Sequence, residues 1–236
     1  GLNDQITSRS AQLVVTFVKE GASADPVTRI QETIANLKGD SVLKTGMHAL
    51  TRAPQKIGKT PRLVAVPGYT SQAASGGGAN PIAADMPGLL GKLGAIAFLD
   101  GPNSNRQGGI DWRETLPSSE RMVPIETGAY IQDADGNEIL RPMSGRAVGM
   151  QIRVDEEKGG YPFHTLAGRD VFGITQPGRE MDFTIDDADT EGQQLLAQQI
   201  GIVVRGEANM EAAVGQGGFQ LIAFETLSTD PDLKFY

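Results

Sequence analysis

The sequence predicts an α/β fold with a mostly parallel central sheet and helices on both faces. Two observations lead to this prediction. Short apolar runs rich in β-branched residues alternate along the chain with segments whose apolar residues recur at helical spacing. Strands that alternate with helices in this way pair in parallel, because each helical crossover returns the chain to the start of the sheet. The 236 residues contain no internal repeat and no long linker, so one domain over residues 1–236 is predicted.

In the first half of the chain, strands and helices are predicted in turn. Residues 12–19 form a β-branched apolar run that predicts a buried strand. Asp25 followed by Pro26 is typical of a helix N-terminus. A second helix is predicted at 41–52 and is expected to stop at Pro54. Further strands are predicted at 62–66 and 95–99, and further helices at 82–93 (weakened at 87–88) and 110–116.

The second half continues this alternation and adds a hairpin. Thr190 and Gln193 have the spacing of a capping box, which predicts a helix that runs to Ile200. The polar sequence at 133–138 predicts a turn between two extended pieces. The other expected strands are 121–126, 129–132, 138–142, 181–185, 201–205 and 219–226, with a small-residue helix at 144–159.

The composition excludes several classes of protein. A formal charge of −8 and a pI near 4.8 argue against coating nucleic acid, because phosphate binding needs a basic face. The absence of cysteine excludes disulfides, thiolate nucleophiles and cysteine-ligated metals. No apolar run approaches the roughly 20 residues of a membrane helix. The first residue is Gly rather than Met, which predicts a processed or partial product.

Several short segments share an order and spacing with one family. The chain has GMHAL at 46–50, TPRLVAVPG at 60–68 and RPMSG at 141–145. These are followed by a turn from Asp155 to Gly159 and by the aromatic-proline pair 161–162. In this order the segments resemble the tail sheath proteins of contractile phage tails. Residues 201–206 and 218–219 fall where that family has later segments, without the asparagines and the tryptophan found there.

The resemblance implies a fold, a function and partners. Such proteins have a subtilisin-like core topology without the catalytic triad, and a further C-terminal domain and arms that this chain is expected to lack. The implied function is that of a structural subunit, which polymerises helically around the tail tube and contracts to drive the tube through the host envelope for genome ejection. The implied partners are copies of itself in stacked hexameric rings, the tail tube protein, the baseplate and the tail terminator. The implied location is the virion tail, assembled in the host bacterial cytoplasm.

A serine hydrolase is the first rival to this interpretation, because subtilisin itself is one. A triad needs an exposed serine, a histidine within hydrogen-bond reach and a carboxylate that orients the histidine. The only histidines are His48, in a predicted helix, and His164, in a predicted loop, and both are expected to be structural. Ser144 does not stand in a nucleophile elbow and is expected to cap a helix. No catalytic residue, cofactor site or metal site is therefore predicted.

Three further motifs invite a ligand but have simpler interpretations. Residues 58–60 imitate the end of a phosphate-binding loop, yet a strand follows instead of a helix, and the glycines at 76–78 lack the dinucleotide-binding context. Residues 133–138 have the glycine of a calcium loop at the wrong position, so a hairpin turn is expected.

An acidic patch surrounds Met181 and consists of Asp182, Asp186, Asp187 and Asp189. It is expected to be a solvated face, or in an assembly to meet a basic surface of a partner.

Two alternatives to a phage tail sheath stay open at this point. One is an α/β serine hydrolase-like enzyme whose nucleophile the sequence does not reveal. The other is the sheath of a bacteriocin, a gene transfer agent or another injection device, which would have the same protein physics.

Overall fold

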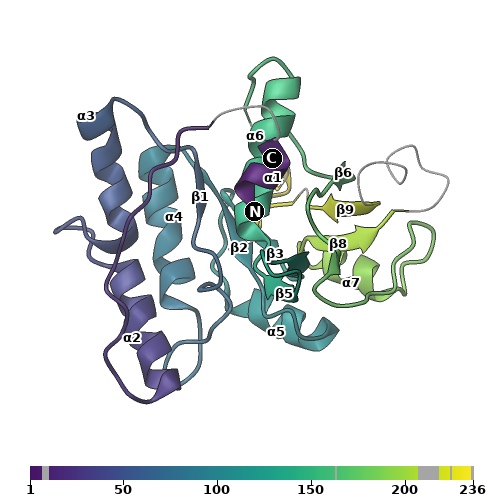
Figure 1. Cartoon of the computed structure of the whole chain (residues 1–236), viewed down its shortest axis with the longest axis horizontal. Helices are drawn as coiled ribbons and strands as arrows, with labels where there is room; N and C mark the ends of the chain where they lie inside the picture. Colours follow the sequence, from purple (N-terminus) through teal and green to yellow (C-terminus); the bar gives the residue numbers. More distant parts are fainter. Residues whose placement is uncertain (7–10, 163, 207–217, 224, 235–236) are drawn as a thin grey trace.

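The computed structural model describes residues 1–6, 11–162, 164–206, 218–223 and 225–234. A three-stranded sheet lies near the middle of the molecule (Figure 1). Three helices lie at one end of the long axis: α2 (Pro26–Lys38), α3 (Ala53–Ile57) and α4 (Pro81–Leu93). At the opposite end lie α7 (Glu191–Ala197) and a second sheet of small strands.

The central sheet has the order β1-β2-β3, and both of its strand pairs are parallel. Its strands are β1 (Leu63–Ala65), β2 (Ile96–Asp100) and β3 (Met122–Ile125). Every residue of β2 and β3 is buried, as expected for strands of a parallel sheet that is covered on both faces. The strands predicted at 62–66, 95–99 and 121–126 are therefore confirmed.

Alternate side chains of β2 enter two different cores. Ala97 and Leu99 belong to a cluster formed with buried residues of α2 and α4. Ile96 and Phe98 belong to a second cluster, formed with buried residues of α6 (Ser144–Glu157). Helices thus cover both faces of the central sheet. The carboxyl end of β2 lies next to the start of α6, where the Ser144 amide is hydrogen-bonded to Asp100.

Short helices complete these layers. The helix α1 (Leu2–Ile6) crosses α6 so closely that a Cβ added at Gly149 would lie 2.7 Å from the Leu2 carbonyl oxygen. The other short helices are η1 (Gly46–Arg52), α5 (Arg106–Thr115) and η3 (Pro231–Leu233). None of the helices in the described ranges is long and apolar enough to cross a membrane.

The remaining strands form two small antiparallel sheets. One has the order β5-β4-β7 and consists of β4 (Ala129–Gln132), β5 (Glu138–Arg141) and β7 (Gln176–Pro177). The other has the order β6-β9-β8 and consists of β6 (Arg169–Asp170), β8 (Ile202–Arg205) and β9 (Phe219–Ile222). A parallel bridge between Ile125 and Gly201 links β3 to the start of β8. The structure is thus a mixture of helices and small sheets, and parallel pairing among the described strands is limited to β1, β2, β3 and this bridge.

The run at 12–19, predicted to be a buried strand, has no assigned secondary structure and pairs with no described strand. Leu13 is 69% exposed, Val15 54% and Phe17 91%. The β-branched pattern favours an extended backbone, but it does not determine which chain covers the side chains. The prediction of a buried strand is therefore wrong.

The helix predicted at 41–52 begins later than expected. The carboxylate of Asp40 accepts hydrogen bonds from the Val42 and Leu43 amides at 2.8 and 2.7 Å, which closes a turn before η1. Pro54 does not stop a helix but lies at the start of α3, where its missing N–H costs nothing.

Near the C-terminal end, two further predictions are wrong. Residues 181–185 form no strand, and the capping box is absent because Thr190 Oγ1 donates to the Asp187 carbonyl while Gln193 donates to the Thr184 carbonyl. The helix α7 also ends at Ala197 rather than Ile200, and Gln199 just beyond it has a positive φ of 65°. In the last predicted strand, β9 ends at Ile222, and residue 224 lies outside the described residues.

Candidate functional site

Ser144, the first serine to test as a nucleophile, is buried and hydrogen-bonded to a carboxylate. Its amide donates to Asp100 Oδ1 at 2.7 Å, and its hydroxyl donates to Asp100 Oδ2 at 2.6 Å. The Gly68 amide donates to the same Oδ2 at 3.1 Å. Asp100 thus joins the end of β2 to the loop after β1 and to the start of α6. The expectation that Ser144 caps α6 is wrong, because Met143 is the N-cap residue and Ser144 turns to Asp100 instead.

Burial raises the pKa of Asp100, although the hydrogen bonds from Ser144 and Gly68 oppose this effect. A carboxylate that receives three donors is well satisfied, so the Ser144 hydroxyl serves as a donor to it. A nucleophilic serine would instead direct its proton at a base.

His48 forms the orienting half of a triad, which the sequence analysis missed. The ring is buried on η1, and its Nε2 lies 2.8 Å from Asp85 Oδ2 of α4. The two residues are separated by 37 positions, and no local pattern connects them. A histidine oriented by a carboxylate is one part of hydrolase chemistry, so the position of the nearest serine decides what the pair can do.

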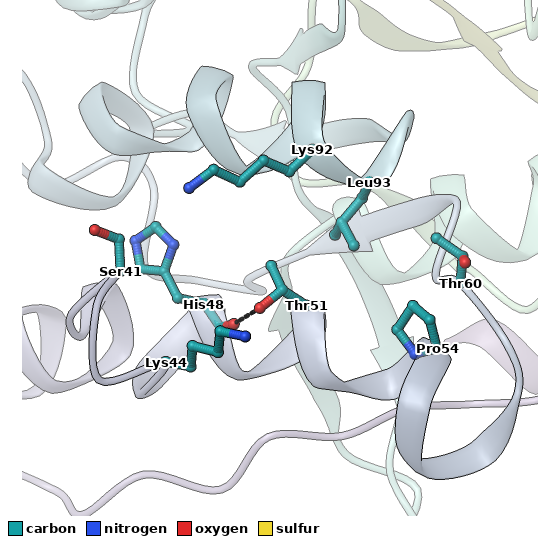
Figure 2. Close-up of a pocket in the computed structure, with 8 residues that line it drawn as sticks. All are labelled: Ser41, Lys44, His48, Thr51, Pro54, Thr60, Lys92 and Leu93. Carbon is teal, nitrogen blue, oxygen red and sulfur yellow. Dashed lines mark hydrogen bonds between the residues drawn. The ribbon is translucent and has the colours of Figure 1, made fainter.

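The His48 ring borders a pocket of about 370 Å³ between η1, the end of α4 and the 41–44 loop (Figure 2). Ser41 borders the same pocket, but no hydrogen bond joins it to His48 in the part of the chain that the structure describes. The remaining lining is basic, hydroxylic or apolar, and consists of Lys44, Thr51, Pro54, Thr60, Lys92 and Leu93. The pocket therefore has the character of a site for an anionic group.

His164 lies apart from any serine that could act with it. Its amide donates to Asp155 Oδ1 at 3.0 Å, and its carbonyl accepts from the Gln151 amide group at 2.8 Å. These bonds fix the loop after α6. Its Nε2 is buried and has no hydrogen-bond partner among the described residues. The described residues thus bring neither Ser144 nor Ser41 into a hydrogen bond with His48 or His164.

A second buried carboxylate, Glu126, lies just after β3 and was also missed. Its Oε1 accepts from the Ser104 amide at 2.8 Å, and its Oε2 lies 3.2 Å from the Nε of Arg179. Arg179 also lies 2.7 Å from a carboxylate oxygen of Glu191 at the start of α7. Burial raises the pKa of Glu126, and the positive charge of Arg179 opposes that shift. Asp100 and Glu126 border one hollow of about 200 Å³ at the carboxyl end of the central sheet.

The motifs that resembled ligand loops form turns. Gly58 ends α3 with a φ of 67°, so no helix N-terminus follows it. Residues 76–78 are three glycines with positive φ in a loop. Asp133 Oδ1 accepts from the Asp135 and Asn137 amides at 2.9 and 2.8 Å, which explains residues 133–138 as the turn between β4 and β5. Within the described ranges, no group of three or more histidines and acids could hold a metal ion.

The acidic patch is exposed at the end of the molecule next to α7. Asp182, Asp186, Asp187 and Asp189 are all exposed, and none forms an ion pair with a described residue. Two candidate interaction surfaces follow. One is this acidic patch, and the other is the exposed apolar run at 12–19.

The chain is similar in sequence to several proteins that are named tail sheath proteins. It is 28% identical over 226 residues to a protein named as a prophage major tail sheath protein of Pseudomonas aeruginosa, covering 95% of this chain and 53% of that protein. It is 26% identical over 188 residues to the tail sheath protein of Burkholderia phage BcepMu, covering 76% and 38% of the two chains. It is 24% identical over 207 residues to the major tail sheath protein of Serratia phage KSP20, covering 86% and 49%.

The chain thus spans about half the length, or less, of the curated relatives that it matches. No family model matches the sequence. Among solved structures, the chain is similar in fold to the helical sheath of the anti-feeding prophage in its contracted state, with a TM-score of 0.50, 11% identity, and coverage of 91% of this chain and 55% of that one. The resemblance to tail sheath proteins found in the sequence is confirmed by these relatives.

Proposed function

We propose that this chain is the body of a contractile tail sheath subunit, which polymerises helically around a tail tube and contracts to drive the tube through the host envelope for genome ejection. One observation carries this proposal. The similarity to proteins named tail sheath proteins extends over nearly the whole chain, from the helical end to the small sheets. The fold similarity to a contracted helical sheath supports the same proposal independently of sequence.

The proposal includes partners and a location. The partners are copies of this chain in stacked hexameric rings, the tail tube protein, the baseplate and the tail terminator. The location is the virion tail, after assembly in the host bacterial cytoplasm. Subunits of such a structure need heterologous contacts that do not close on themselves, so that copies continue as a helix. Neither nucleic acid nor membrane is a proposed partner, and the net charge of −8 disfavours the first.

Two finer features of the fold belong to the proposal. One is a subtilisin-like core topology without its triad, supported by the parallel β1-β2-β3 sheet with helices on both faces. The other is that residues 1–236 form one body domain, which is supported by the helical layers that pack on both faces of one central sheet.

The segment at 11–19 is a suitable contact between subunits. In tail sheath proteins, arms add strands to the sheets of neighbouring subunits, so that main-chain hydrogen bonds keep the lattice connected. Here the segment has no assigned secondary structure, exposes Leu13, Val15 and Phe17, and pairs with no described strand. Added as a strand to the sheet of a neighbouring copy, it would place these three side chains on one face of that sheet.

Electron microscopy of the full-length protein that contains this chain tests the proposal. We expect tubes with helical order. Phe17→Asp should reduce tube formation while leaving the thermal unfolding of the subunit unchanged, because Phe17 is 91% exposed. Tyr161→Asp, at a residue that is 73% exposed elsewhere, is the matched control and should form tubes normally. Full-length protein that stays monomeric under all conditions would contradict the proposal.

A serine hydrolase is the second candidate, and the His48–Asp85 pair beside Ser41 is the observation that favours it. We propose that the protein is not an enzyme, because its relatives are named tail sheath proteins and, among the described residues, neither Ser41 nor Ser144 is hydrogen-bonded to His48 or His164. A serine-reactive fluorophosphonate probe should leave the folded protein unlabelled. Labelling that disappears in Ser41→Ala or Ser144→Ala would establish the hydrolase instead.

A further inference from the structure

One end of the molecule concentrates basic side chains around the pocket described above. Residues 38–62 contain six Lys and Arg and a single acid, Asp40. Lys44, Arg52, Lys56 and Lys59 are exposed, and Lys92 adds another exposed cation from the end of α4. None of these five forms an ion pair with a described residue. We call this surface, residues 38–62 with Lys92, the basic end.

The basic end is also apolar in places, as an interaction surface is. Val42 is 85% exposed, Leu43 66% and Ile57 55%. Exposed aliphatic side chains are a feature of surfaces that bind a partner when they lie next to one another and are rimmed by polar groups. A surface that combines exposed aliphatic groups with unpaired cations suits a partner that offers apolar and acidic groups together.

The pocket gives this surface a specific place for a carboxylate. Lys44 and Lys92 come from different elements and both border the cavity of about 370 Å³, together with the hydroxyl groups of Thr51 and Thr60 (Figure 2). None of the described residues that line the cavity is an acid. Asp85, which contacts Nε2 of the His48 ring, is not among them. A carboxylate entering the pocket would meet two ammonium groups and the Thr60 hydroxyl, since the Thr51 hydroxyl already donates to the His48 carbonyl at 2.8 Å.

The opposite end of the molecule has the complementary character. Residues 180–191 contain six acids and no base. Five of these acids are exposed and unpaired among the described residues: Glu180, Asp182, Asp186, Asp187 and Asp189. Ile185, between them, is 66% exposed. We call residues 180–191 the acidic end.

The two ends cannot meet within one molecule. The basic end includes α3 and the end of α4, whereas the acidic end leads into α7 on the far side of the central sheet, along the longest axis (Figure 1). Two complementary surfaces that face away from each other make a head-to-tail contact between copies. Repetition of such a contact produces an open polymer, unless the rotation closes a ring.

We propose that the acidic end of one copy docks on the basic end of the next, with the carboxylate of Asp186 or Asp187 inserted between Lys44 and Lys92. Ile185 then packs against exposed aliphatic side chains of the basic end, such as Val42 and Leu43. The proposal rests on the proposed sheath function for its partner, a second copy, and it adds which two surfaces make one of the contacts. Complementary charges of this kind fix orientation and exclude wrong pairings.

Charge reversal in the full-length protein tests this contact. One variant reverses the basic end (Lys44→Glu with Lys92→Glu), another reverses the acidic end (Asp186→Lys with Asp187→Lys), and a third carries all four changes. Each single-end variant should raise the critical concentration for polymerisation by about tenfold or more, because like charges then meet. The four-fold variant should return to within about threefold of wild type, because the pairs are restored with exchanged signs.

The control variant reverses exposed charges elsewhere, Lys158→Glu with Asp135→Lys, and should polymerise as wild type does. Thermal unfolding of each variant separates loss of contact from loss of fold. The docking is overturned if single-end variants polymerise normally, or if the four-fold variant is not rescued. It is also overturned if only the basic-end variant loses polymerisation, since the basic end would then contact a surface of the next copy other than the acidic end.

Sedimentation velocity separates this contact from the sheath function. Each single-end variant should remain monomeric alone, whereas an equimolar mixture of the two should associate, because the reversed basic end of one meets the reversed acidic end of the other. If the mixture associates but the wild-type protein forms no tubes, the docking contact is supported and the sheath function is rejected. Tubes in wild type without association of the mixture would reject the docking alone.

Discussion

At the scale of single residues, buried carboxylates hold the carboxyl end of the central sheet together. Asp100 receives donors from Ser144 and Gly68, and Glu126 receives the Ser104 amide and the Arg179 guanidinium. Each of them fastens segments that are far apart in sequence. Asp100 is the last residue of β2 and Glu126 comes directly after β3, so an acid at the end of an apolar run was a signal that could have found them. Their partners, 44 and 53 residues away, could not be read from any local pattern.

Ser144→Ala should destabilise the fold, because it removes one hydrogen bond to a buried carboxylate. A hydrogen bond to a charged group contributes about 1.5–3 kcal/mol, and we expect a loss in that range from the free energy of unfolding in urea. Ser75→Ala makes the same change at an exposed serine and should stay within about 0.5 kcal/mol of wild type. Equal stability of the two variants would show that the Ser144–Asp100 bond has no structural role.

The raised pKa of Asp100 gives stability a definite dependence on pH. Burial makes the folded protein hold the Asp100 proton more tightly than the unfolded chain does, so charging this carboxyl costs stability. The cost is absent below the ordinary pKa of an aspartate, about 3.9, and increases as pH rises through the raised pKa. Asn does not titrate, so the stability of wild type relative to Asp100→Asn should fall as pH rises from about 4.

Asp133 provides the control of opposite sign. Hydrogen bonds from Asn137, first of all its amide, lower the pKa of Asp133, so its contribution is present above the ordinary pKa and is lost as pH falls through the lowered one. The stability of wild type relative to Asp133→Asn should therefore rise with pH over the acid range. Urea unfolding measured across pH checks both variants, and a shared direction would contradict the assignment of Asp100.

At the scale of elements, local signals predicted most helices and strands but not what surrounds them. Asp25 and Pro26 predicted the start of α2, and the Asp25 carboxylate does accept from the Thr28 amide at 2.8 Å. The run at 12–19 has an equally clear pattern, but no strand is assigned to it. It was misassigned as buried, because a strand pattern reports backbone preference and apolarity, whereas burial depends on a partner that local sequence does not specify.

The start of α4 provides an element-scale prediction, because Asn80 supports two segments at once. Its Oδ1 accepts from the Ile82 and Ala83 amides at 2.9 and 3.3 Å, and its Nδ2 donates to the Tyr69 and Gln72 carbonyls at 3.0 and 2.8 Å. Asn80→Ala loses the cap and leaves two half-buried carbonyls without this donor, so we expect a cost of about 2–4 kcal/mol.

The matched control for Asn80 is the exposed cap of α5. Asn105 accepts only from the Gly108 amide, at 2.9 Å, and Asn105→Ala should cost about 1 kcal/mol. Thermal unfolding of both variants measures the difference. A cost for Asn80→Ala no larger than that for Asn105→Ala would mean that the loop before α4 is not held by this side chain.

At the scale of the whole molecule, the charge distribution opposes random association and favours one orientation. The net charge of −8 repels copies that approach in most orientations, whereas the basic and acidic ends attract each other when they face. Both effects weaken in salt, since the Debye length falls from about 30 Å at 0.01 M to about 3 Å at 1 M. The salt dependence of wild type alone therefore cannot separate repulsion from attraction.

Two variants with the same net charge make the separation. Lys44→Gln with Lys92→Gln removes the facing cations, whereas Arg141→Gln with Lys158→Gln removes two exposed cations elsewhere, so the ratio of the second variant's polymerisation rate to the first's reports the local attraction. We expect this ratio to be well above one at low salt and to approach one as salt screens the facing charges. Light scattering of the full-length proteins across salt concentrations measures both rates. A ratio that stays constant would mean that the two lysines act through packing or not at all, and that the ends of this molecule do not select their partner by charge.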